Sequence, residues 1–338
     1  MLLYQHYRRL LFQLPPEQAH HVALMALHYR WYKQRAPRYQ ETLRQTVMGL
    51  SFSHPIGLAA GFDKDGVALS GLQDIGFSHI ECGTVTPRPQ AGNPSPRLFR
   101  LPAAAAIINR MGFNNAGVMA LAQRLEQRPR DIIIGVNIGK NRDTPVEEAT
   151  SDYGFCYRVI YPYADYVTVN ISSPNTAQLR DLQSSDSLER LVAAMQNAKD
   201  QLSTRHRRVV PIAVKVAPDL TSAQIEAMAR VFNAYKIDAV LATNTTIDKR
   251  AVSILPYGQE EGGLSGVPLQ NMSTDVIGQF RLCLDDSIPI IGLGGIADSQ
   301  SAQAKLDAGA TLLQLYTSMV YQGPEVLAKI IGGISIPP

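Results

Sequence analysis

Cysteine is scarce in this sequence and follows no ligand pattern. The 338-residue chain has three cysteines, Cys82, Cys156 and Cys283, which are far apart and form no CxxC pair. An odd number of widely spaced cysteines is typical of a reducing compartment and argues against a disulfide framework. The seven histidines lack the spacing of metal ligands, so no metal site is expected. A G-x-S-x-G elbow of the hydrolase type is also absent.

Long apolar runs are missing as well. No stretch approaches the roughly 20 apolar residues that a membrane-spanning helix requires. The first residues do not show a long apolar core followed by a small-residue cleavage site, so we expect the protein to stay in the cytoplasm. With 45% hydrophobic and 18% charged residues, the chain can build a large core in one big domain or two ordinary ones.

Positive and negative residues nearly balance over the whole chain, but they are unevenly distributed along it. The net charge of +3 gives no general basic field, so nucleic acid is not an expected partner. Residues 1–44 contain seven Lys and Arg against two Glu, a balance of +5, and the rest of the chain therefore carries −2. The sequence indicates a basic N-terminal arm, residues 1–40, attached to a slightly acidic body, residues 41–338.

Eight short β-rich runs alternate with helical stretches after about residue 50. The helical stretches include 187–202 and 221–235. This alternation predicts a parallel (β/α)₈ barrel, also called a TIM barrel, and leaves an open doubly wound sheet as the alternative. The predicted strands are 55–60, 79–82, 132–138, 166–171, 211–217, 238–243, 289–294 and 311–316.

Polar residues gather at the carboxyl ends of these predicted strands, where a barrel carries its chemistry. Turn formation alone does not account for such residues at the same end of nearly every strand. In strand order they are Gly61 to Lys64, Gly83 and Thr84, Asn137, Asn170 to Asn175, Lys215, Thr243 to Thr245, Gly294 and Gly295, and Tyr316 and Thr317.

Two of these polar residues are lysines. Lys215 lies between Val214 and Val216 in an apolar strand, where an unpaired ammonium group is costly, so we expect it to meet an anion or a polar ligand. A structural ion pair is the alternative. Lys64 follows a strand of glycine, leucine and alanine, which favours a ligand role over a solvated surface position.

Two loops indicate binding of a phosphate and of a planar ring. The stretch GLGGIA, residues 292–297, lies on the penultimate strand and lacks the context of a dinucleotide site. In a barrel this position predicts a phosphate site together with the turn at 316–318. The stretch NRMGFNN, residues 109–115, offers amides that suit a ring with imide groups and a carboxylate. For Asn114 and Asn115 an ordinary turn is the alternative.

The ordered motifs resemble those of the dihydroorotate dehydrogenase family, from about residue 10 to residue 330. Within that family, the chain is similar to the membrane-associated class that uses quinone. The resemblance implies an FMN-containing barrel that oxidises dihydroorotate to orotate in pyrimidine synthesis. The motifs are GFDKDG, GTVTPRPQ, PRLFRL, NRMGFNN, NIGKN, NISSPNT, VKVAPDL, ATNTT, GGLSG and IIGLGGI.

The resemblance also implies two sets of binding residues, which overlap at Lys64 and Asn170. The implied FMN contacts are Ala60, Gly61, Phe62, Asp63, Lys64, Thr84, Asn137, Asn170, Lys215, Thr243, Gly266, Gly295, Tyr316 and Thr317. The implied substrate contacts are Lys64, Asn109, Arg110, Met111, Gly112, Phe113, Asn170, Asn175, Asn244 and Thr245.

By the same resemblance, Ser173 is the general base, where soluble relatives have cysteine. It takes the proton from C5 of the substrate while the hydride at C6 passes to flavin N5. Serine is a poor base because its pKa lies far above the working pH. It therefore needs Pro174 to fix its direction, and Lys64 and Lys215 to supply favourable electrostatics.

Two positions depart from the family pattern. Ala177 and Gln178 stand where the family usually has Pro-Gly, so we expect the loop over the substrate to hinge differently. Ser318 stands where glycine or alanine is common, which puts the phosphate contact of this turn in doubt.

The N-terminal arm has the pattern of two basic amphipathic helices. The first, within residues 1–14, places Leu3, Tyr7, Leu10, Leu11 and Leu14 on one face beside Arg8 and Arg9, and the second follows Pro15 and Pro16 with Val22, Met25, Ala26 and Tyr29 along one side. This pattern suits a membrane surface, with an ordinary helical pair packed on the barrel as the alternative.

The resemblance implies that the arm admits a membrane quinone, ubiquinone or menaquinone, at the cytoplasmic face of the cell membrane. His20, Arg100 and Tyr316 match positions along the quinone path. The sequence leaves three alternatives. They are an FMN-barrel pyrimidine reductase that uses NAD(P)H, a non-redox barrel that binds a phosphorylated sugar, and a peripheral membrane protein with an inactive barrel.

Overall fold

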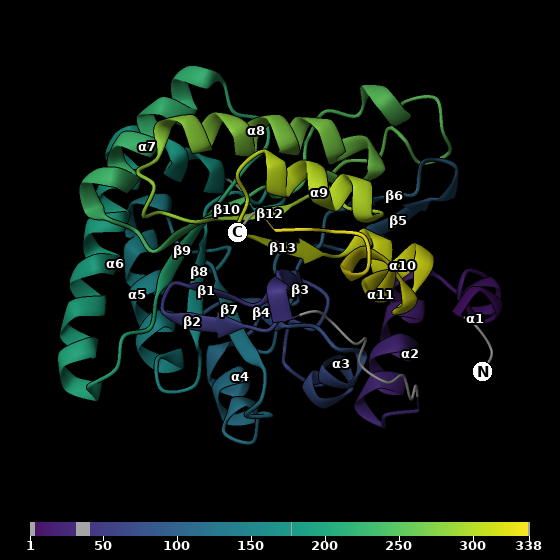
Figure 1. Ribbon diagram of the computed structural model, residues 1–338, viewed down its shortest axis with the longest axis horizontal. Coiled ribbons are helices and arrows are strands. Elements are labelled where there is room, and N and C mark those ends of the chain that lie inside the picture. The colour runs from purple at the N-terminus through teal and green to yellow at the C-terminus, as the bar shows by residue number, and fades with distance from the viewer. Residues whose placement is uncertain (1–3, 32–40, 177, 337–338) are drawn as a thin grey trace.

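The computed structural model describes residues 4–31, 41–176 and 178–336, and its centre is a closed barrel of eight strands (Figure 1). Neighbouring barrel strands are parallel all the way round. The (β/α)₈ prediction is therefore confirmed, and the open sheet is excluded. The barrel strands are β3 (Ile56–Leu58), β4 (His79–Val85), β7 (Ile133–Ile138), β8 (Tyr166–Asn170), β9 (Ile212–Val216), β10 (Ala239–Ala242), β12 (Ile290–Leu293) and β13 (Leu312–Leu315).

The barrel strands are buried on both faces, as parallel strands covered by helices are. Every residue of β8, β9 and β10 is buried. Register places Asn170 of β8 beside Lys215 of β9, and Asn137 of β7 beside Thr168 of β8. Asn170 and Lys215 therefore lie at the same level near the carboxyl ends of their strands, whereas Asn137 lies level with Thr168, two residues before Asn170.

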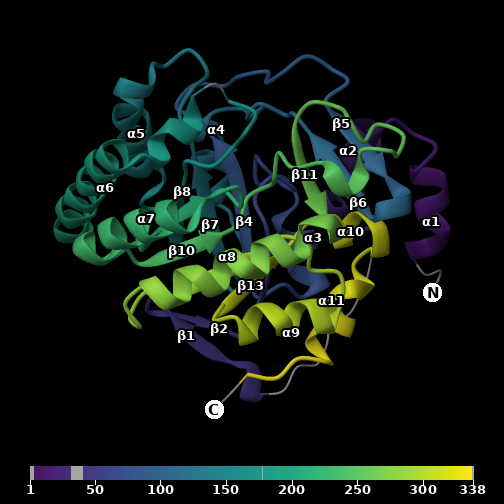
Figure 2. The same ribbon diagram turned by 90° about the horizontal axis from the view of Figure 1, so that it is seen from above.

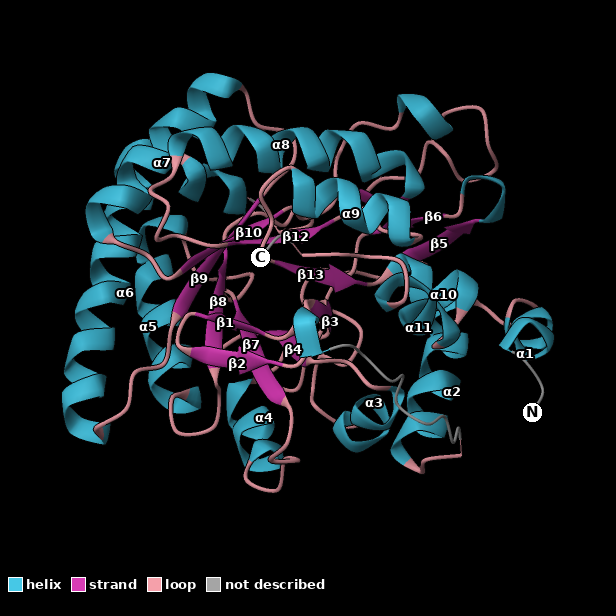
Figure 3. Cartoon of the chain, in the orientation of Figure 1, coloured by secondary structure: helices cyan, strands magenta, loops and turns pink. Residues whose placement is uncertain are grey.

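Helices surround the barrel, as Figures 2 and 3 show. Helix α7 begins at a capping box in which Thr221 and Gln224 satisfy each other's backbone amides. The surrounding helices are α3 (Leu69–Ile75), α4 (Val118–Leu125), α5 (Ala149–Ile160), α6 (Ser185–His206), α7 (Ser222–Tyr235), α8 (Gln270–Cys283), α9 (Ser299–Asp307), α10 (Thr317–Gln322) and α11 (Glu325–Ile331). Short 3₁₀ turns are η1 (Glu41–Leu43), η2 (Pro102–Ala104), η3 (Val146–Glu148), η4 (Leu179–Gln183), η5 (Arg250–Val252) and η6 (Val267–Leu269).

A hairpin covers the amino-terminal end of the barrel. Its strands are β1 (Gln45–Val47) and β2 (Leu50–Phe52), joined by Met48 and Gly49, which both have positive φ. Two residues with positive φ are what a tight two-residue hairpin turn requires. Val47 and Phe52 pack with apolar residues that include Leu241 of β10. The hairpin therefore seals the end of the barrel opposite the predicted chemistry.

A small antiparallel sheet, absent from the sequence prediction, has the strand order β11-β6-β5. Its strands are β5 (Leu98–Leu101), β6 (Ala106–Asn109) and β11 (Gly263–Gly266). In this sheet Asn109 pairs with both Gly263 and Leu98. It brings Asn109 and Gly266, which are far apart in the sequence, to the cavity described below.

The N-terminal arm contains helices α1 (Tyr4–Leu11) and α2 (Pro16–His28), which lie beside α3, α10 and β5. The apolar face predicted for the first helix is shorter than expected, because α1 ends at Leu11 and Leu14 lies beyond its end. The residue before a proline avoids helical conformation, and Leu14 precedes Pro15. Leu3 and residues 32–40 lie outside the described residues. Within the described part of the chain, no helix has the length and apolarity needed to cross a membrane.

Candidate active site

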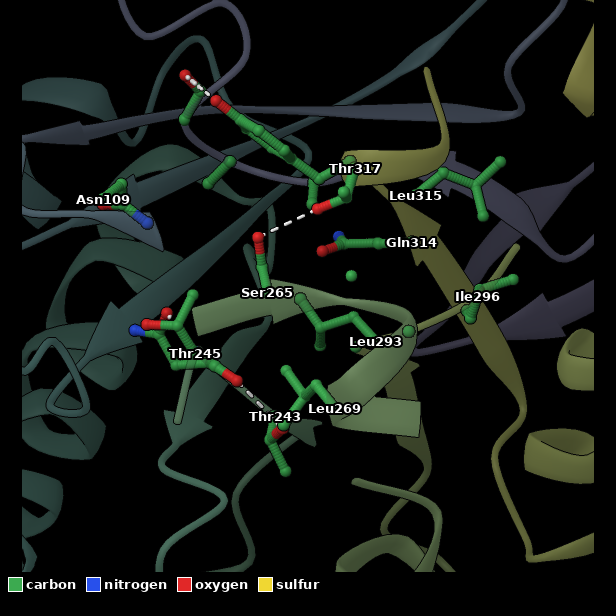
Figure 4. A pocket seen from close by; sticks show the side chains of 18 of the residues that line it. Asn109, Thr243, Thr245, Ser265, Leu269, Leu293, Ile296, Gln314, Leu315 and Thr317 are labelled. Atoms are coloured by element: carbon green, nitrogen blue, oxygen red, sulfur yellow. Dashed lines mark hydrogen bonds between the residues drawn. The ribbon is translucent and has the colours of Figure 1, made fainter. Parts of the chain in front are cut away.

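A large cavity lies at the carboxyl ends of the barrel strands (Figure 4). Its empty volume is about 1220 Å³, including the open mouth. Predicted residues at or just after the carboxyl ends of seven different barrel strands line it, namely Gly61, Thr84, Asn170, Lys215, Thr243, Gly295 and Tyr316.

One side of the cavity carries a network of amides. Nδ2 of Asn175 donates to Oδ1 of Asn109 across 3.3 Å. Nδ2 of Asn244 donates to Oγ of Ser172 across 3.0 Å, and that hydroxyl donates to Oδ1 of Asn170 across 2.9 Å. The amides from the fourth and sixth barrel strands and from β6 are thereby held in fixed directions around one space. Of the other predicted substrate contacts, Lys64, Met111, Gly112, Phe113 and Thr245 also line the cavity.

Ser173 lies on the same side of the cavity, in the loop that follows β8. Its side chain is 6% exposed. Its hydroxyl oxygen accepts a hydrogen bond of 3.2 Å from the backbone amide of Asn175. Pro174 lies between the two residues and has a fixed φ, so the loop has few ways to turn the hydroxyl away.

Two lysines give the cavity positive charge. Burial, with a smaller contribution from Arg97, lowers the pKa of Lys64 to about 8. Nζ of Lys64 contacts Oδ1 of Asn114. Burial also lowers the pKa of Lys215, whereas nearby Glu81 opposes that change. Lys215 makes no ion pair within 4 Å among the described residues. This favours the prediction that its ammonium group binds a ligand over the alternative of a structural ion pair.

Beneath the cavity, inside the barrel, lies a buried acidic residue that the sequence analysis missed. The Glu81 carboxylate accepts four hydrogen bonds, from Asn137 at 2.8 Å and from Tyr166, Thr168 and Gln314 at 3.0 Å each. Four donors to one carboxylate are the compensation that a buried charge requires. The signal in the sequence was an acidic residue in the middle of the apolar run HIEC.

Four of the predicted cofactor and substrate contacts do not line this cavity. Asn137 lies beneath it and accepts a hydrogen bond of 2.5 Å from Thr84, which does line it. Asp63 is buried and accepts hydrogen bonds from the backbone amides that lead into α3, while burial raises its pKa. The guanidinium of Arg110 pairs with Glu260 at 2.8 Å. Phe62 lines a second cavity instead.

Small residues open the end of the cavity formed by β11, the β12 loop and the start of α10. Gly266 and Gly295 have positive φ. A Cβ on Gly266 would lie 2.3 Å from the carbonyl oxygen of Ala105, and a Cβ on Gly295 would lie 2.4 Å from Cα of Gln270. Thr317 joins this end through a hydrogen bond of 2.9 Å with Ser265, drawn in Figure 4. Both glycines are therefore required by the backbone, and they lie in the loops where a barrel carries a phosphate, the role predicted for them.

A second cavity, of about 540 Å³, lies between α2 and the barrel. It is lined by Glu17 and His20 of α2 and by Phe62. Four residues line both cavities and therefore form the thin wall between them, namely Gly61, Lys64, Met111 and Tyr316.

Of the three residues predicted along a quinone path, His20 and Tyr316 line this second cavity. The Phe62 ring lies edge-on to both, with centroids 5.3 Å from His20 and 6.0 Å from Tyr316. Burial lowers the pKa of His20 to about 4, so it is neutral at physiological pH. Arg100 is not among the lining residues, and its guanidinium donates to backbone carbonyls of the segment that joins α1 to α2.

The described residues contain no group of His, Cys, Asp and Glu that could hold a metal ion. Within them, the main cavity offers amides, hydroxyls that include those of Ser173, Ser265 and Ser318, two lysines and glycine-rich loops. Such a set can bind a planar, partly anionic ring, hold a phosphate and move one proton.

Comparison with known proteins gives a consistent result. The family model "Dihydroorotate dehydrogenase" matches residues 42–336. A protein of Nitrosomonas eutropha named dihydroorotate dehydrogenase (quinone) is 51% identical over 326 residues, which is 96% of this chain and 95% of that protein. A protein of the same name from Shewanella sp. strain MR-4 is 48% identical over 333 residues, 98% of each chain.

The fold agrees with a solved structure of the same kind. The ligand-free DHODH from Eimeria tenella superimposes with a TM-score of 0.89 and 37% sequence identity, over 94% of this chain and 93% of that one. The two relatives match 98% and 96% of this chain and so include most of the N-terminal arm, whereas the family model begins at residue 42. The chain belongs to the dihydroorotate dehydrogenase family.

Proposed function

We propose that this protein oxidises dihydroorotate to orotate in pyrimidine synthesis and delivers the electrons to a membrane quinone through bound FMN. The observation that carries the proposal is the main cavity, in which Ser173, the amide network and the two lysines meet at the carboxyl end of a closed barrel. Family membership supports the same activity, because the similar proteins are named dihydroorotate dehydrogenase (quinone).

FMN is the cofactor that the cavity residues suit. When bound, the flavin accepts a hydride and later releases electrons to the quinone. Gly266, Gly295 and Thr317 would hold the phosphate. Lys215 would lie near the ring system, with its positive charge supported by Glu81 beneath. Ala60, Gly61, Lys64, Thr84, Asn170, Thr243 and Tyr316 complete the set of cavity residues proposed for FMN.

Dihydroorotate carries an imide-like ring and a carboxylate, and the amide side of the cavity matches both. Asn109, Asn170, Asn175 and Asn244 can donate to ring carbonyls and accept from ring N–H groups. Lys64 would neutralise the carboxylate. Asn175 bonds directly to Asn109, and Asn244 and Asn170 are joined through the hydroxyl of Ser172. These amides are therefore oriented before the substrate arrives, which lowers the entropic cost of binding.

Ser173 would act as the general base that takes the proton from C5 of the substrate. The hydroxyl proton of Ser173 would pass to solvent water at the cavity mouth, and the proton from C5 would then restore the hydroxyl. The amide of Asn175 donates to the serine oxygen and so favours the negative charge that develops there in between. Lys64 and Lys215 would offset negative charge that builds up on the substrate ring and on its acceptor.

Residues 1–40 would form the module for quinone entry and membrane attachment, and residues 41–338 the catalytic barrel. The second cavity, with His20 and Tyr316 in its lining, lies against the wall of the main cavity. Tyr7, Leu10, Val22, Met25 and Tyr29 of the arm expose their apolar side chains, as a helix pair on a lipid surface does. We infer a peripheral protein at the cytoplasmic face of the cell membrane, with ubiquinone or menaquinone as acceptor.

The direct test is to purify the protein and record its visible absorption before and after adding dihydroorotate without oxygen. A yellow protein that dihydroorotate bleaches, and that a quinone then restores, supports the proposal. Bleaching by NADPH but not by dihydroorotate would favour a pyrimidine reductase instead. A colourless protein with no affinity for FMN would favour a barrel that binds a phosphorylated sugar.

A further inference from the structure

Ser318 presents a buried hydroxyl that has nothing to bind. The residue is 6% exposed and lines the main cavity. Among the described residues, its Oγ has no hydrogen-bond partner. Buried polar groups almost always have a partner, and one left without costs folding free energy. The unpaired hydroxyl of Ser318 therefore indicates a bound ligand that supplies its missing hydrogen-bond partner.

Among the described residues, the other hydroxyl and amide donors at this end of the cavity are already engaged. The hydroxyl of Ser265 donates to the carbonyl of Ile107 across 3.2 Å, so the hydroxyl of Thr317 donates to Ser265 in turn. The Tyr321 hydroxyl donates to the carbonyl of Ala106 across 2.7 Å. Nε2 of Gln322 donates to the carbonyl of Ala297 across 2.6 Å. Ser318 is thus the hydroxyl donor that remains for a ligand here.

The surroundings of Ser318 favour an anionic oxygen as its acceptor. The residues that line the main cavity include no Asp or Glu, so no carboxylate repels an anion there. Gly266 and Gly295 line the same end of the cavity, and both positions require glycine because a Cβ would meet the backbone of Ala105 or of Gln270. A phosphate has several strong acceptor oxygens, and a hydrogen bond to a charged group is stronger than one between neutral groups.

We propose that the Ser318 hydroxyl donates a hydrogen bond to the phosphate of bound FMN and raises the selectivity of the apoprotein for FMN over riboflavin. This inference rests on the proposed function, since it requires FMN in the main cavity. It assigns a binding role to the residue that departs from the glycine or alanine common at this position.

The test compares wild-type apoprotein with Ser318→Ala, using FMN and riboflavin as separate ligands and quenching of flavin fluorescence as the readout. We expect Ser318→Ala to weaken FMN binding by roughly tenfold or more, the factor that loss of a hydrogen bond to a charged group gives. Riboflavin, which has no phosphate, should bind both proteins equally. The apoprotein of Ser318→Ala should also melt at a higher temperature than wild type, because the variant removes an unsatisfied buried hydroxyl.

Ser78→Ala is the matched control. Ser78 is also a buried serine, but its hydroxyl already donates to the carbonyl of Ile56, and it lies beside β4 at the opposite end of the barrel. This variant should lower the melting temperature and leave FMN affinity unchanged. A serine whose role is only structural would behave as Ser78 does, so the opposite signs separate the two explanations.

Three outcomes would overturn the inference. They are unchanged FMN affinity in Ser318→Ala, equal weakening of FMN and riboflavin, or a lower melting temperature of the Ser318→Ala apoprotein. Should Ser318→Ala not fold, Ser318→Gly carries the same expectation for FMN against riboflavin. A wild-type apoprotein that binds neither flavin would contradict the proposed function itself, and this inference with it.

Discussion

The backbone amide of Asn175 donates a hydrogen bond to the hydroxyl oxygen of Ser173 across 3.2 Å. The residue between them is Pro174, whose ring limits the backbone to a narrow range of φ. The loop after β8 therefore holds a serine oxygen at the cavity with a donor directed at it. This geometry addresses the chemical difficulty of a serine base, because an N–H group at the oxygen makes negative charge on it less costly.

Lys64 gives the first prediction, which concerns pH. Its pKa is lowered from the usual value to about 8, so in the free protein its positive charge is present below pH 8 and is lost as the pH rises through that value. If Lys64 binds the carboxylate of the ligand, the Kd of orotate should increase steadily above pH 8. Titrations between about pH 6 and pH 10 measure this change, since the pKa of lysine lies within that range.

Lys64→Gln provides the control for this experiment. The variant should bind orotate weakly at every pH, and its Kd should not increase above pH 8, because glutamine does not titrate. If the Kd of orotate increases above pH 8 by the same factor in Lys64→Gln, another group causes the effect, and Lys64 does not bind the carboxylate.

The second prediction concerns Glu81, the buried carboxylate beneath the cavity. Glu81→Gln replaces an acceptor of four hydrogen bonds by an amide, one end of which is a donor facing other donors. We expect a loss of about 1–3 kcal/mol in the free energy of unfolding, measured with urea. Glu226→Gln on the exposed face of α7 should change it by less than about 0.5 kcal/mol. Equal stability of the two variants would contradict the role assigned to Glu81.

The third prediction concerns the exposed apolar residues of the arm. Leu10 and Met25 are 65% and 52% exposed on α1 and α2. Changing both to Glu should weaken co-sedimentation with anionic lipid vesicles by tenfold or more, because burying each apolar side chain is worth about 1.5–3 kcal/mol. Leu282→Glu is the control, since Leu282 is 87% exposed on α8, away from the arm. Vesicle binding that falls equally in the control would show that the arm has no special part in it.

The fourth prediction separates the arm from the barrel. Deletion of residues 1–40 should abolish quinone reduction but leave reduction of the bound flavin by dihydroorotate intact, because the main cavity is built from residues after position 58. Stopped-flow absorbance measures the flavin step and quinone turnover measures the second. Undiminished quinone turnover by the shortened protein would contradict the assignment of the second cavity as the quinone site.

The barrel could be predicted from the sequence because its strands are continuous apolar runs. Each of the eight predicted runs contains an observed strand or overlaps most of one. The sheet of β5, β6 and β11 could not be predicted in the same way. Its strands have four residues each, β11 contains two glycines, and it pairs with β6 from more than 150 positions away. Long-range pairing of this kind leaves no periodic pattern in the sequence.

The site could be predicted in outline but not at every residue. Position along the chain does not say where a side chain points, and Lys64 and Asp63 illustrate this. Lys64 lines the main cavity, whereas the Asp63 carboxylate accepts hydrogen bonds from the backbone of Val67 and Ala68. Arg110 is likewise engaged by Glu260, a residue that no local motif connects to it. Ala177, expected to change the loop over the substrate, lies outside the described residues.

The measurement that tests the central claim most directly is the rate at which dihydroorotate bleaches the flavin of Ser173→Ala in the absence of oxygen. A general base accelerates a reaction by about 10²–10⁴-fold, so dihydroorotate should reduce the flavin of this variant more slowly by that factor. The variant should still bind FMN and show its spectrum. The neighbouring variant Ser172→Ala loosens the hydrogen bonds to Asn170 and Asn244, so it should mainly raise the dihydroorotate concentration needed for half-maximal rate. A flavin reduction rate in Ser173→Ala equal to that of the wild type would contradict the account.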